Sequence, residues 1–297
     1  MTCFGCTPQT PAEPRSWTQV LQAERLEHVS GGARKGPFVA GQALWQTQGD
    51  QLRTVRIGTP QWRAIWVSAT DEAWAVGTAG KVARLRSGEW VLDTFGTGQT
   101  GIDICAWGEE AWIPVTNGEI HRLRAGTWTS WKPNALADRH TGVLWGASPK
   151  DVWMHTHQMA SGVPPDLGHW DGQNWSFHSL SRSGYIASMH GSASDDIWAV
   201  GWTVKWIGKG PLVAHWDGAR WSEVTVPTRD RLTDVKVAKD GTVWISGLDG
   251  TLLRGNIKAF RVVEAPKGTL SSVYPAADGS VWVVVDGQRL MKSVTRP

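Results

Sequence analysis

The sequence lacks the patterns that mark membrane spans, helical folds and nucleic-acid binding. It contains no run of about 18 apolar residues, so we expect no transmembrane helix. Its 30 basic and 27 acidic residues are spread evenly, without the basic stripe that nucleic-acid binding requires. Leu, Glu and Lys never recur at the helical spacing of about 3.6 residues. These absences argue against a membrane-spanning, nucleic-acid-binding or mainly helical protein.

The usual catalytic motifs are missing as well. There is no Gly-x-Ser-x-Gly nucleophile elbow, no His-Glu-x-x-His zinc motif and no phosphate-binding loop. Acidic residues recur mainly at expected turns, which favours a structural role over a convergent pair of acid and base. We therefore expect no catalytic residues, no cofactor and no metal site.

Tryptophan, by contrast, is abundant, with 21 residues in 297. A marker Trp recurs in variants of the pattern Asp-x-x-Trp-Ala-Val-Gly. The markers are Trp45, Trp74, Trp112, Trp153, Trp198, Trp244 and Trp282, separated by 29, 38, 41, 45, 46 and 38 residues. Short strands repeating every 40–45 residues or so are typical of β-propeller blades. The sequence thus predicts an all-β, seven-bladed β-propeller. Six blades are the alternative, because the first gap is short.

A second pattern follows most of the markers. HWDGQNW at 169–175 and HWDGARW at 215–221 place an Asp-Gly pair between two strand-like segments. Asp-Gly favours positive φ in a two-residue hairpin loop. We therefore interpret Asp171 and Asp217 as turn residues rather than metal ligands. The marker tryptophans are expected to pack between neighbouring sheets.

The two ends of the repeat region complement each other. Ser16–Val20 matches a fourth strand, whereas Gln288–Val294 ends the repeats on a third strand. We predict that these segments pair and close the ring, which removes the free sheet edges. The propeller domain then spans 16–297. Its first blade is irregular, because 51–57 is interpreted as a third strand and a fourth strand is short or missing.

Each blade is predicted to begin with an apolar inner strand that places one side chain near the central channel or the seam between blades. That position is assigned to Trp66, Trp107, Trp145, His190, Val237 and Tyr274. Its chemistry varies too much for a ring of metal ligands, so His190 is interpreted as a packed histidine. Cys105 lies in the apolar segment ICAW and is interpreted as a small buried hydrophobic residue.

Residues 1–15 show no periodicity and are expected to form a disordered tail or a tether. Within them, Cys3-Phe4-Gly5-Cys6 resembles the end of a bacterial lipoprotein signal, with Cys6 as the lipidated residue. The charged and apolar regions of such a signal do not precede it in this sequence. A chance match and a Cys-x-x-Cys half-site for a metal or a redox reaction are the alternatives.

The pattern DxWAVG…HWDGxxW resembles the propeller repeats of bacterial secreted and lipid-anchored proteins. Asp240–Arg254 is also similar to tectonin-type repeats, and the Trp-Ile/Val-Gly strand is similar to the propellers of sensor-kinase ectodomains. The resemblance covers 16–294 and implies a propeller fold. In tectonin relatives it also implies glycan or lipopolysaccharide binding at the surface. The unequal repeat lengths depart from those regular lectins, so repeated identical sugar sites are not expected.

The departures from the repeat indicate a candidate binding surface. Blades four and five carry long insertions between their second and third strands, and a long connection precedes blade four. Such loops open onto one face of a propeller, so we expect one crowded rim. The candidate binding residues on it are Trp202, Trp206, Lys205, Lys209, Arg139, His140, His155 and His157. Exposed Trp with basic neighbours suits a glycan, an anionic surface or a protein partner.

Two alternatives apply to this rim. The tryptophans could fold back and cover a blade edge instead of meeting a ligand. His155 and His157 alternate along a strand, so both could reach one metal ion. We prefer to interpret the pair as packed or surface histidines.

These features lead to one functional hypothesis and one alternative. We expect a monomeric, non-catalytic binding or scaffold propeller of the bacterial cell envelope or the extracellular space, held at a membrane only through a lipid on Cys6. Its partner is a glycan or an envelope protein, bound through the enlarged loops of blades three to five. The alternative is a propeller hydrolase or lyase acting on a polysaccharide, which needs two carboxylates that face each other.

Overall fold

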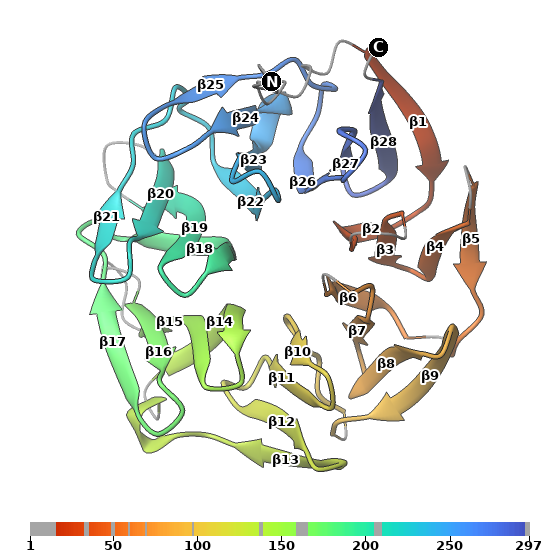
Figure 1. The fold of residues 1–297 in the computed structure, drawn as a ribbon, viewed down its shortest axis with the longest axis vertical. Helices are drawn as coiled ribbons and strands as arrows, with labels where there is room; N and C mark the ends of the chain where they lie inside the picture. The colour runs from red at the N-terminus through yellow and green to blue at the C-terminus, as the bar shows by residue number, and fades with distance from the viewer. Residues whose placement is uncertain are drawn as a thin grey trace, which may run out of the picture.

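The computed structural model of the chain is a ring of seven four-stranded antiparallel sheets (Figure 1). The predicted seven-bladed all-β propeller is therefore confirmed. The structure describes residues 16–32, 36–48, 51–58, 60–68, 70–96, 98–136, 139–158, 166–204 and 210–294. These residues contain no α-helix, only the 3-10 turns η1 (Asn134–Leu136) and η2 (Leu248–Gly250). In each blade the first strand lies nearest the centre of the ring.

The blades follow one another along the chain. Blade 1 contains β2 (Leu26–Ser30), β3 (Phe38–Gly41), β4 (Leu44–Gln48) and β5 (Gln51–Val55). Blade 2 contains β6 (Trp62–Val67), β7 (Ala73–Gly77), β8 (Lys81–Arg86) and β9 (Glu89–Thr94). Blade 3 contains β10 (Cys105–Trp107), β11 (Glu110–Pro114), β12 (Ile120–Arg124) and β13 (Thr127–Trp131). Blade 4 contains β14 (Arg139–Ser148), β15 (Asp151–Gln158), β16 (Asp166–Trp170) and β17 (Trp175–Ser179).

The remaining three blades complete the ring. Blade 5 contains β18 (Gly184–Ala193), β19 (Asp196–Thr203), β20 (Pro211–Trp216) and β21 (Trp221–Glu223). Blade 6 contains β22 (Leu232–Val237), β23 (Val243–Gly247), β24 (Leu252–Gly255) and β25 (Phe260–Val262). Blade 7 contains β26 (Leu270–Pro275), β27 (Val281–Val285) and β28 (Arg289–Val294), with β1 (Ser16–Gln22) as its outer strand.

The strand β1 closes the ring by pairing antiparallel with β28 (Figure 1). The register runs from Ser16 opposite Val294 to Gln22 opposite Arg289. The indole Nε1 of Trp17 also donates a hydrogen bond to the carbonyl of Glu264 at 3.2 Å. The predicted pairing of the two chain ends is confirmed, and the last blade is built from both.

Blade 1 is complete, so the expectation of a short or missing fourth strand is wrong. The segment 51–57, interpreted as a third strand, supplies the fourth strand β5 instead. Trp45 is not the counterpart of the other markers, because it lies in the third strand, β4. Phe38 begins the second strand and is fully buried. A phenylalanine thus replaces the marker tryptophan in this blade.

The hairpins between the third and fourth strands are of two kinds. Blades 2 and 3 have two-residue loops in which both residues adopt positive φ. Ser87 and Gly88 have φ of 49° and 87°, and Ala125 and Gly126 have φ of 49° and 78°. These values are typical of the turn whose twist matches the flanking strands.

The Asp-Gly loops of blades 4 and 5 differ from the two-residue hairpins that we expected. In blade 5 the loop has four residues, 217–220, and the side chain of Asp217 organises it. Its Oδ1 accepts the backbone N–H groups of Ala219 at 3.0 Å and Arg220 at 2.8 Å. Asp171 makes the equivalent bonds in blade 4. Both residues are turn residues as predicted, but they act through side-chain hydrogen bonds.

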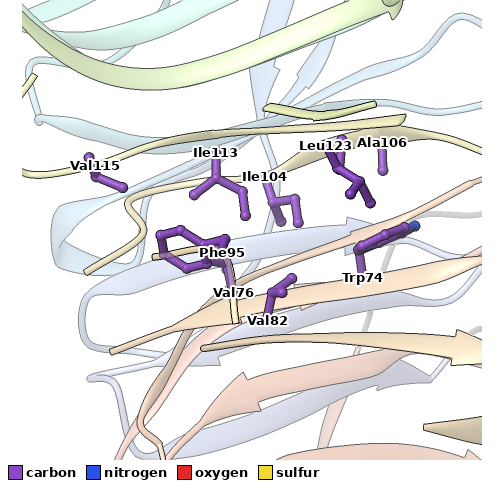
Figure 2. Close-up of a cluster of buried hydrophobic side chains, with 11 residues drawn as sticks. Trp74, Val76, Val82, Phe95, Ile104, Ala106, Ile113, Val115 and Leu123 are labelled. Atoms are coloured by element: carbon purple, nitrogen blue, oxygen red, sulfur yellow. The ribbon is translucent and has the colours of Figure 1, made fainter. Parts of the chain in front are cut away.

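The marker tryptophans lie in the seams between blades, as expected. Figure 2 shows Trp74 and Val82 of blade 2 facing Ile104 and Ile113 of blade 3. Trp74 is 2% exposed. Burial of such side chains contributes about 2–3 kcal/mol each. Cys105 lies in the next seam, where burial raises the pKa of its thiol to about 12, so it is the packed hydrophobic residue that the sequence predicted.

Six marker tryptophans face a basic side chain or a histidine on the third strand of the same blade. The register pairs Trp74 with Arg84, Trp112 with Arg122, Trp153 with His169, Trp198 with His215, Trp244 with Arg254 and Trp282 with Lys292. The guanidinium of Arg84 lies 4.7 Å from the indole centroid of Trp74. His169 stacks on Trp153 at 4.2 Å. The histidine of each HWDG sequence is therefore part of the blade packing.

Candidate functional site

The ring has two faces, which the direction of the inner strands distinguishes. We call the face where these strands begin the N-face, and the face where they end the C-face. A channel cavity of about 200 Å³ lies toward the N-face and is lined by Glu27 and Thr233. A larger cavity of about 400 Å³ lies at the C-face and is lined by Asp240. His190 and Lys236 line both cavities.

A belt of polar side chains on the inner strands joins neighbouring blades. At five of the seven junctions between blades, a side chain from the inner segment of one blade accepts a hydrogen bond from a backbone N–H of the inner strand of the next blade. The acceptor and donor residues are Ser272 and Val29, His28 and Ile65, Asp103 and Leu144, Ser188 and Val235, and Asp234 and Val273. The described inner strands belong to separate sheets, so these bonds connect blades that share no strand pairing. The belt stabilises the ring from within.

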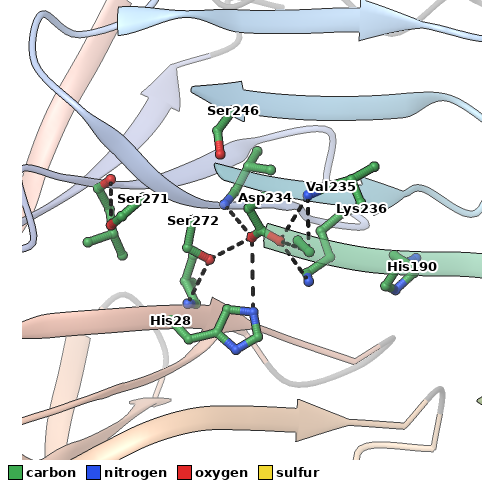
Figure 3. Close-up of polar contacts among 12 residues, drawn as sticks. His28, His190, Asp234, Val235, Lys236, Ser246, Ser271 and Ser272 are labelled. Atoms are coloured by element: carbon green, nitrogen blue, oxygen red, sulfur yellow. Dashed lines mark hydrogen bonds and ion pairs between the residues drawn. The ribbon is translucent and has the colours of Figure 1, made fainter. Parts of the chain in front are cut away.

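Asp234 is the hub of this belt (Figure 3). Its side chain is 5% exposed. Its Oδ1 accepts hydrogen bonds from Ser188 Oγ at 2.7 Å and from Lys236 Nζ at 3.2 Å. Its Oδ2 accepts one from Ser272 Oγ at 2.8 Å, and His28 Nε2 lies 4.0 Å away. One carboxylate therefore links the inner strands of blades 1, 5, 6 and 7.

The polysaccharide-cleaving alternative needs two carboxylates that face each other, and Asp103 and Asp234 line the N-face cavity together with Glu27. Burial raises the pKa of Asp103 to about 6. Burial acts in the same direction on Asp234, but the charge of Lys236 together with the hydrogen bonds from Ser188 and Val273 lowers the pKa of Asp234 to about 2. Divergent pKa values do occur in acid and base pairs. Both carboxylates nevertheless accept a backbone N–H from the next blade, Leu144 or Val273, so the belt occupies them.

Four residues form an exposed patch at the N-face of blade 5, which we call the aromatic platform: Tyr185, Trp202, Val204 and Arg231. Tyr185 and Trp202 face each other across β18 and β19, with ring centroids 4.8 Å apart and planes at 30°. The guanidinium of Arg231 lies 5.5 Å from the centroid of Trp202. Tyr185 is 37% and Val204 is 52% exposed. His155 is fully buried, with its ring centroid 5.0 Å from that of Tyr185.

The structure places the predicted rim residues that it describes in two separate environments, one beside the aromatic platform and one within blade 4. His155 and Trp202 meet through the ring of Tyr185. Arg139 instead forms an ion pair with Asp166, and its guanidinium carbon lies 4.5 Å from the ring centroid of Phe177. Both partners belong to blade 4, so this arginine takes part in the packing of its own blade. His140 is half-buried and pairs in register with His157, of which only the backbone is described. Lys205, Trp206, Lys209 and Cys6 lie outside the described residues.

Four residues were not found from the sequence, namely Tyr185, Val204 and Arg231 of the platform and Lys236 of the channel. The inner-strand alignment was wrong by one residue in blade 6, where Lys236 and not Val237 lies opposite the marker, and by two residues in blade 3, where Cys105 and not Trp107 does so. The sequence does contain a spacing that identifies the inner-strand residue opposite the marker. In five blades the inner-strand residue stands eight positions before its marker: 66 and 74, 145 and 153, 190 and 198, 236 and 244, 274 and 282.

Two searches of the structure were negative. The described part of the chain contains no group of three or more His, Cys, Asp or Glu side chains that could hold a metal ion. Within the same residues, no helix has the length and apolar character needed to cross a membrane.

No family model matches the chain, and no curated protein matches its sequence. Solved structures match it over nearly its full length. A structure of YCF48 bound to D1 peptide is 16% identical, with a TM-score of 0.71, over 98% of this chain and 100% of that chain. A streptogramin B lyase is 13% identical, with a TM-score of 0.74, over 94% and 98%. The WD40 propeller domain of Doa1 is 11% identical, with a TM-score of 0.72, over 96% and 97%.

At such identities the likeness shows the propeller fold alone. The neighbours span different functions, since one was solved with a bound peptide, another is a lyase and a third is a WD40 domain. Propellers of protein-binding and scaffold types are thus among the structural neighbours of this chain. The choice of function depends on the sites themselves.

Proposed function

We propose that this chain is a non-catalytic binding propeller that holds a protein partner at its N-face. The observation that carries the proposal is the aromatic platform, where a Tyr and a Trp ring that pack against each other lie beside an arginine and an exposed valine. Trp, Tyr and Arg supply most of the energy at protein interfaces.

The charge around the platform favours an acidic partner. Segment 227–232 carries two basic residues, Arg229 and Arg231, and one acidic residue, Asp230. Asp230 accepts hydrogen bonds from Thr228 at 3.0 Å and Thr251 at 2.6 Å, so it is engaged within the blade. The partner segment would therefore combine a hydrophobic side chain for the platform with acidic residues on either side.

A protein fits the platform better than a glycan does. A sugar ring binds to an open aromatic face, whereas the tilted ring of Tyr185 packs against that of Trp202. The edges of the two rings and the exposed Val204 instead suit an apolar side chain. The YCF48 structure with its bound peptide shows that a propeller of similar fold takes a peptide.

A photo-crosslinking experiment tests the proposal. p-Benzoylphenylalanine replaces Tyr185 in one variant and Val262, which is 60% exposed on the outer strand of blade 6, in a matched control. A partner purified with the tagged chain and added back should crosslink at 185 and not at 262. Equal crosslinking at both positions would contradict the proposal. Binding on a glycan array that competes with the crosslink would make a sugar the ligand instead.

The location in the cell envelope and the lipid on Cys6 stay predictions. Mass spectrometry of the chain isolated from cell membranes tests both, because a diacylglycerol-modified cysteine adds a defined mass to the N-terminal peptide. An unmodified Cys6 in that peptide would count against the anchor and leave the platform proposal intact.

A further inference from the structure

The cavity at the C-face is a second site, on the opposite side of the ring from the aromatic platform. Its volume is about 400 Å³. Four inner strands contribute side chains to its lining, namely Ser30, His190, Lys236 and Tyr274. Lys236 is only 9% exposed, so its ammonium group is buried in the channel wall. Burial of a charge is costly unless partners satisfy it.

The hydrogen bonds of two histidines fix their tautomers. Val237 N–H donates to His190 Nδ1 at 3.2 Å, and Ile65 N–H donates to His28 Nδ1 at 3.3 Å. A backbone N–H can only donate, so each Nδ1 must carry a lone pair. Burial lowers the pKa of His190 to about 3 and that of His28 to about 4, which keeps both rings neutral at pH 7. Each neutral ring then carries its hydrogen on Nε2.

Asp234 does not have the capacity to satisfy all of these donors. It accepts from Ser188, Ser272, Lys236 and the backbone N–H groups of Val235 and Val273. Five donors already exceed the roughly four lone-pair sites of a carboxylate. Lys236 gives Asp234 one of its three hydrogens. Lys236, which lines the C-face cavity, therefore keeps hydrogens for a further acceptor there.

The charged residues that line the cavity also favour the binding of an anion. Its lining contains the cations Lys236, Lys239 and Arg254 and the carboxylate of Asp240, while the Asp234 carboxylate that pairs with Lys236 is not part of this lining. Cations in a cleft with apolar walls attract anions, and the effect is stronger away from bulk water. Trp244 and Tyr274 supply such walls.

We propose that the C-face cavity is an oxyanion receptor that binds a carboxylate group, with Lys236 Nζ and the Nε2–H of His190 as its donors. The cavity has room for a short dicarboxylic acid or for the side chain of a glutamate. A free small acid and an acidic side chain of a protein share this chemistry, and the test separates them. The site does not depend on the platform, because it lies at the other face.

Nitrogen-15 NMR of the wild-type imidazoles is the first test, and it needs no variant. The proposal expects His190 to show the Nε2–H tautomer at pH 7 and its Nε2 signal to shift when glutarate is added. Glutaramide, the neutral analogue, should leave the signal unchanged. An Nδ1–H tautomer, or equal shifts with the acid and the amide, would overturn the proposal.

A titration by calorimetry then assigns the site and the source of the ligand. Lys236→Met should weaken glutarate binding at least tenfold, whereas Lys258→Met, which removes an exposed cation from the loop between β24 and β25, should leave it within twofold. Equal losses in the two variants would reduce the effect to general charge attraction and contradict the proposal. N-Acetylglutamate N-methylamide is the second ligand. If it binds as glutarate does, the site accepts an acidic side chain; if only glutarate binds, the ligand is a free acid.

Discussion

His215 Nε2 lies 2.8 Å from Asp196 Oδ1 in blade 5, and the same bond joins His169 to Asp151 in blade 4 at 2.8 Å. Asp196 Oδ1 also accepts the indole N–H of Trp198 at 3.1 Å, and the ring of His215 packs on that indole at 4.5 Å. The aspartate, tryptophan and histidine of the DxW…HWDG pattern are thus one packed unit. The repeated sequence pattern therefore indicates a structural triad rather than three separate functional residues.

Replacing the histidine of this triad tests its structural role. We expect His215→Leu to lower the free energy of unfolding by about 1–3 kcal/mol, because it removes a hydrogen bond to a carboxylate. His169→Leu should cost a similar amount in blade 4. Arg220→Ala, whose side chain is 80% exposed, should change the value by less than about 0.5 kcal/mol. Urea denaturation measures all three, and a negligible effect of both histidine variants would contradict the triad.

The neutral histidines of the channel should make the fold sensitive to acid. Burial, and then the charge of Lys236, lowers the pKa of His28 from its ordinary value to about 4. A histidine with a lowered pKa contributes stability that is complete above pH 6.5 and is lost as the pH falls toward 4. For His28 the loss amounts to about 3 kcal/mol. Denaturation at pH 7.5 and pH 4 should show a drop that His28→Gln reduces by this amount, and parallel pH curves would contradict the account.

The Asp-Gly loops offer a test between a turn and a metal ligand. Asp217→Ala should destabilise the fold by about 1 kcal/mol, because the N–H groups of Ala219 and Arg220 lose their acceptor. Asp217→Asn keeps an acceptor oxygen and should cost much less. Thermal melts with and without EDTA should coincide for all three proteins. A melting temperature that falls on addition of EDTA would point to a bound metal instead.

A disulfide across the closing strands tests the junction of the ring. Gln19 and Met291 lie opposite each other in the register of β1 and β28. Cysteines at both positions should form a disulfide and, when oxidised, stabilise the fold by about 3–5 kcal/mol, since the bond links segments far apart in the sequence. Cysteines at Gln19 and Val294 are out of register and should stay reduced. Crosslinking in the second pair and not in the first would place the closure elsewhere.

Much of the fold could be predicted because every blade must bury a similar set of side chains. The marker tryptophans repeat for that reason. The repeats begin with an extra fourth strand and end on a third strand, so the first strand completes the last blade. Blade 1 was misassigned because Phe38 fills the marker position, while Trp45 lies one strand further along. A pattern based on one residue type fails where another large apolar residue packs equally well.

The candidate sites could be predicted only in part. Trp202 was found because it lies beside an insertion, but Tyr185 lies on a strand and Arg231 directly before one, and neither stretch has an unusual sequence. Lys236 was missed because the position was assigned to its apolar neighbour Val237, although the eight-residue spacing to Trp244 identifies the lysine. Contacts between strands of different blades carry no sequence signal of their own.

The most direct test of the account is the affinity of the purified protein partner for platform variants, with melting temperatures measured in parallel. We predict that Trp202→Ala and Arg231→Ala each weaken binding at least tenfold and shift the melting temperature by only a few degrees, whereas Val262→Ala changes neither. Unchanged affinity in both platform variants, or a collapse of the melting temperature that accounts for the lost binding, would contradict the assignment of the N-face as the binding surface.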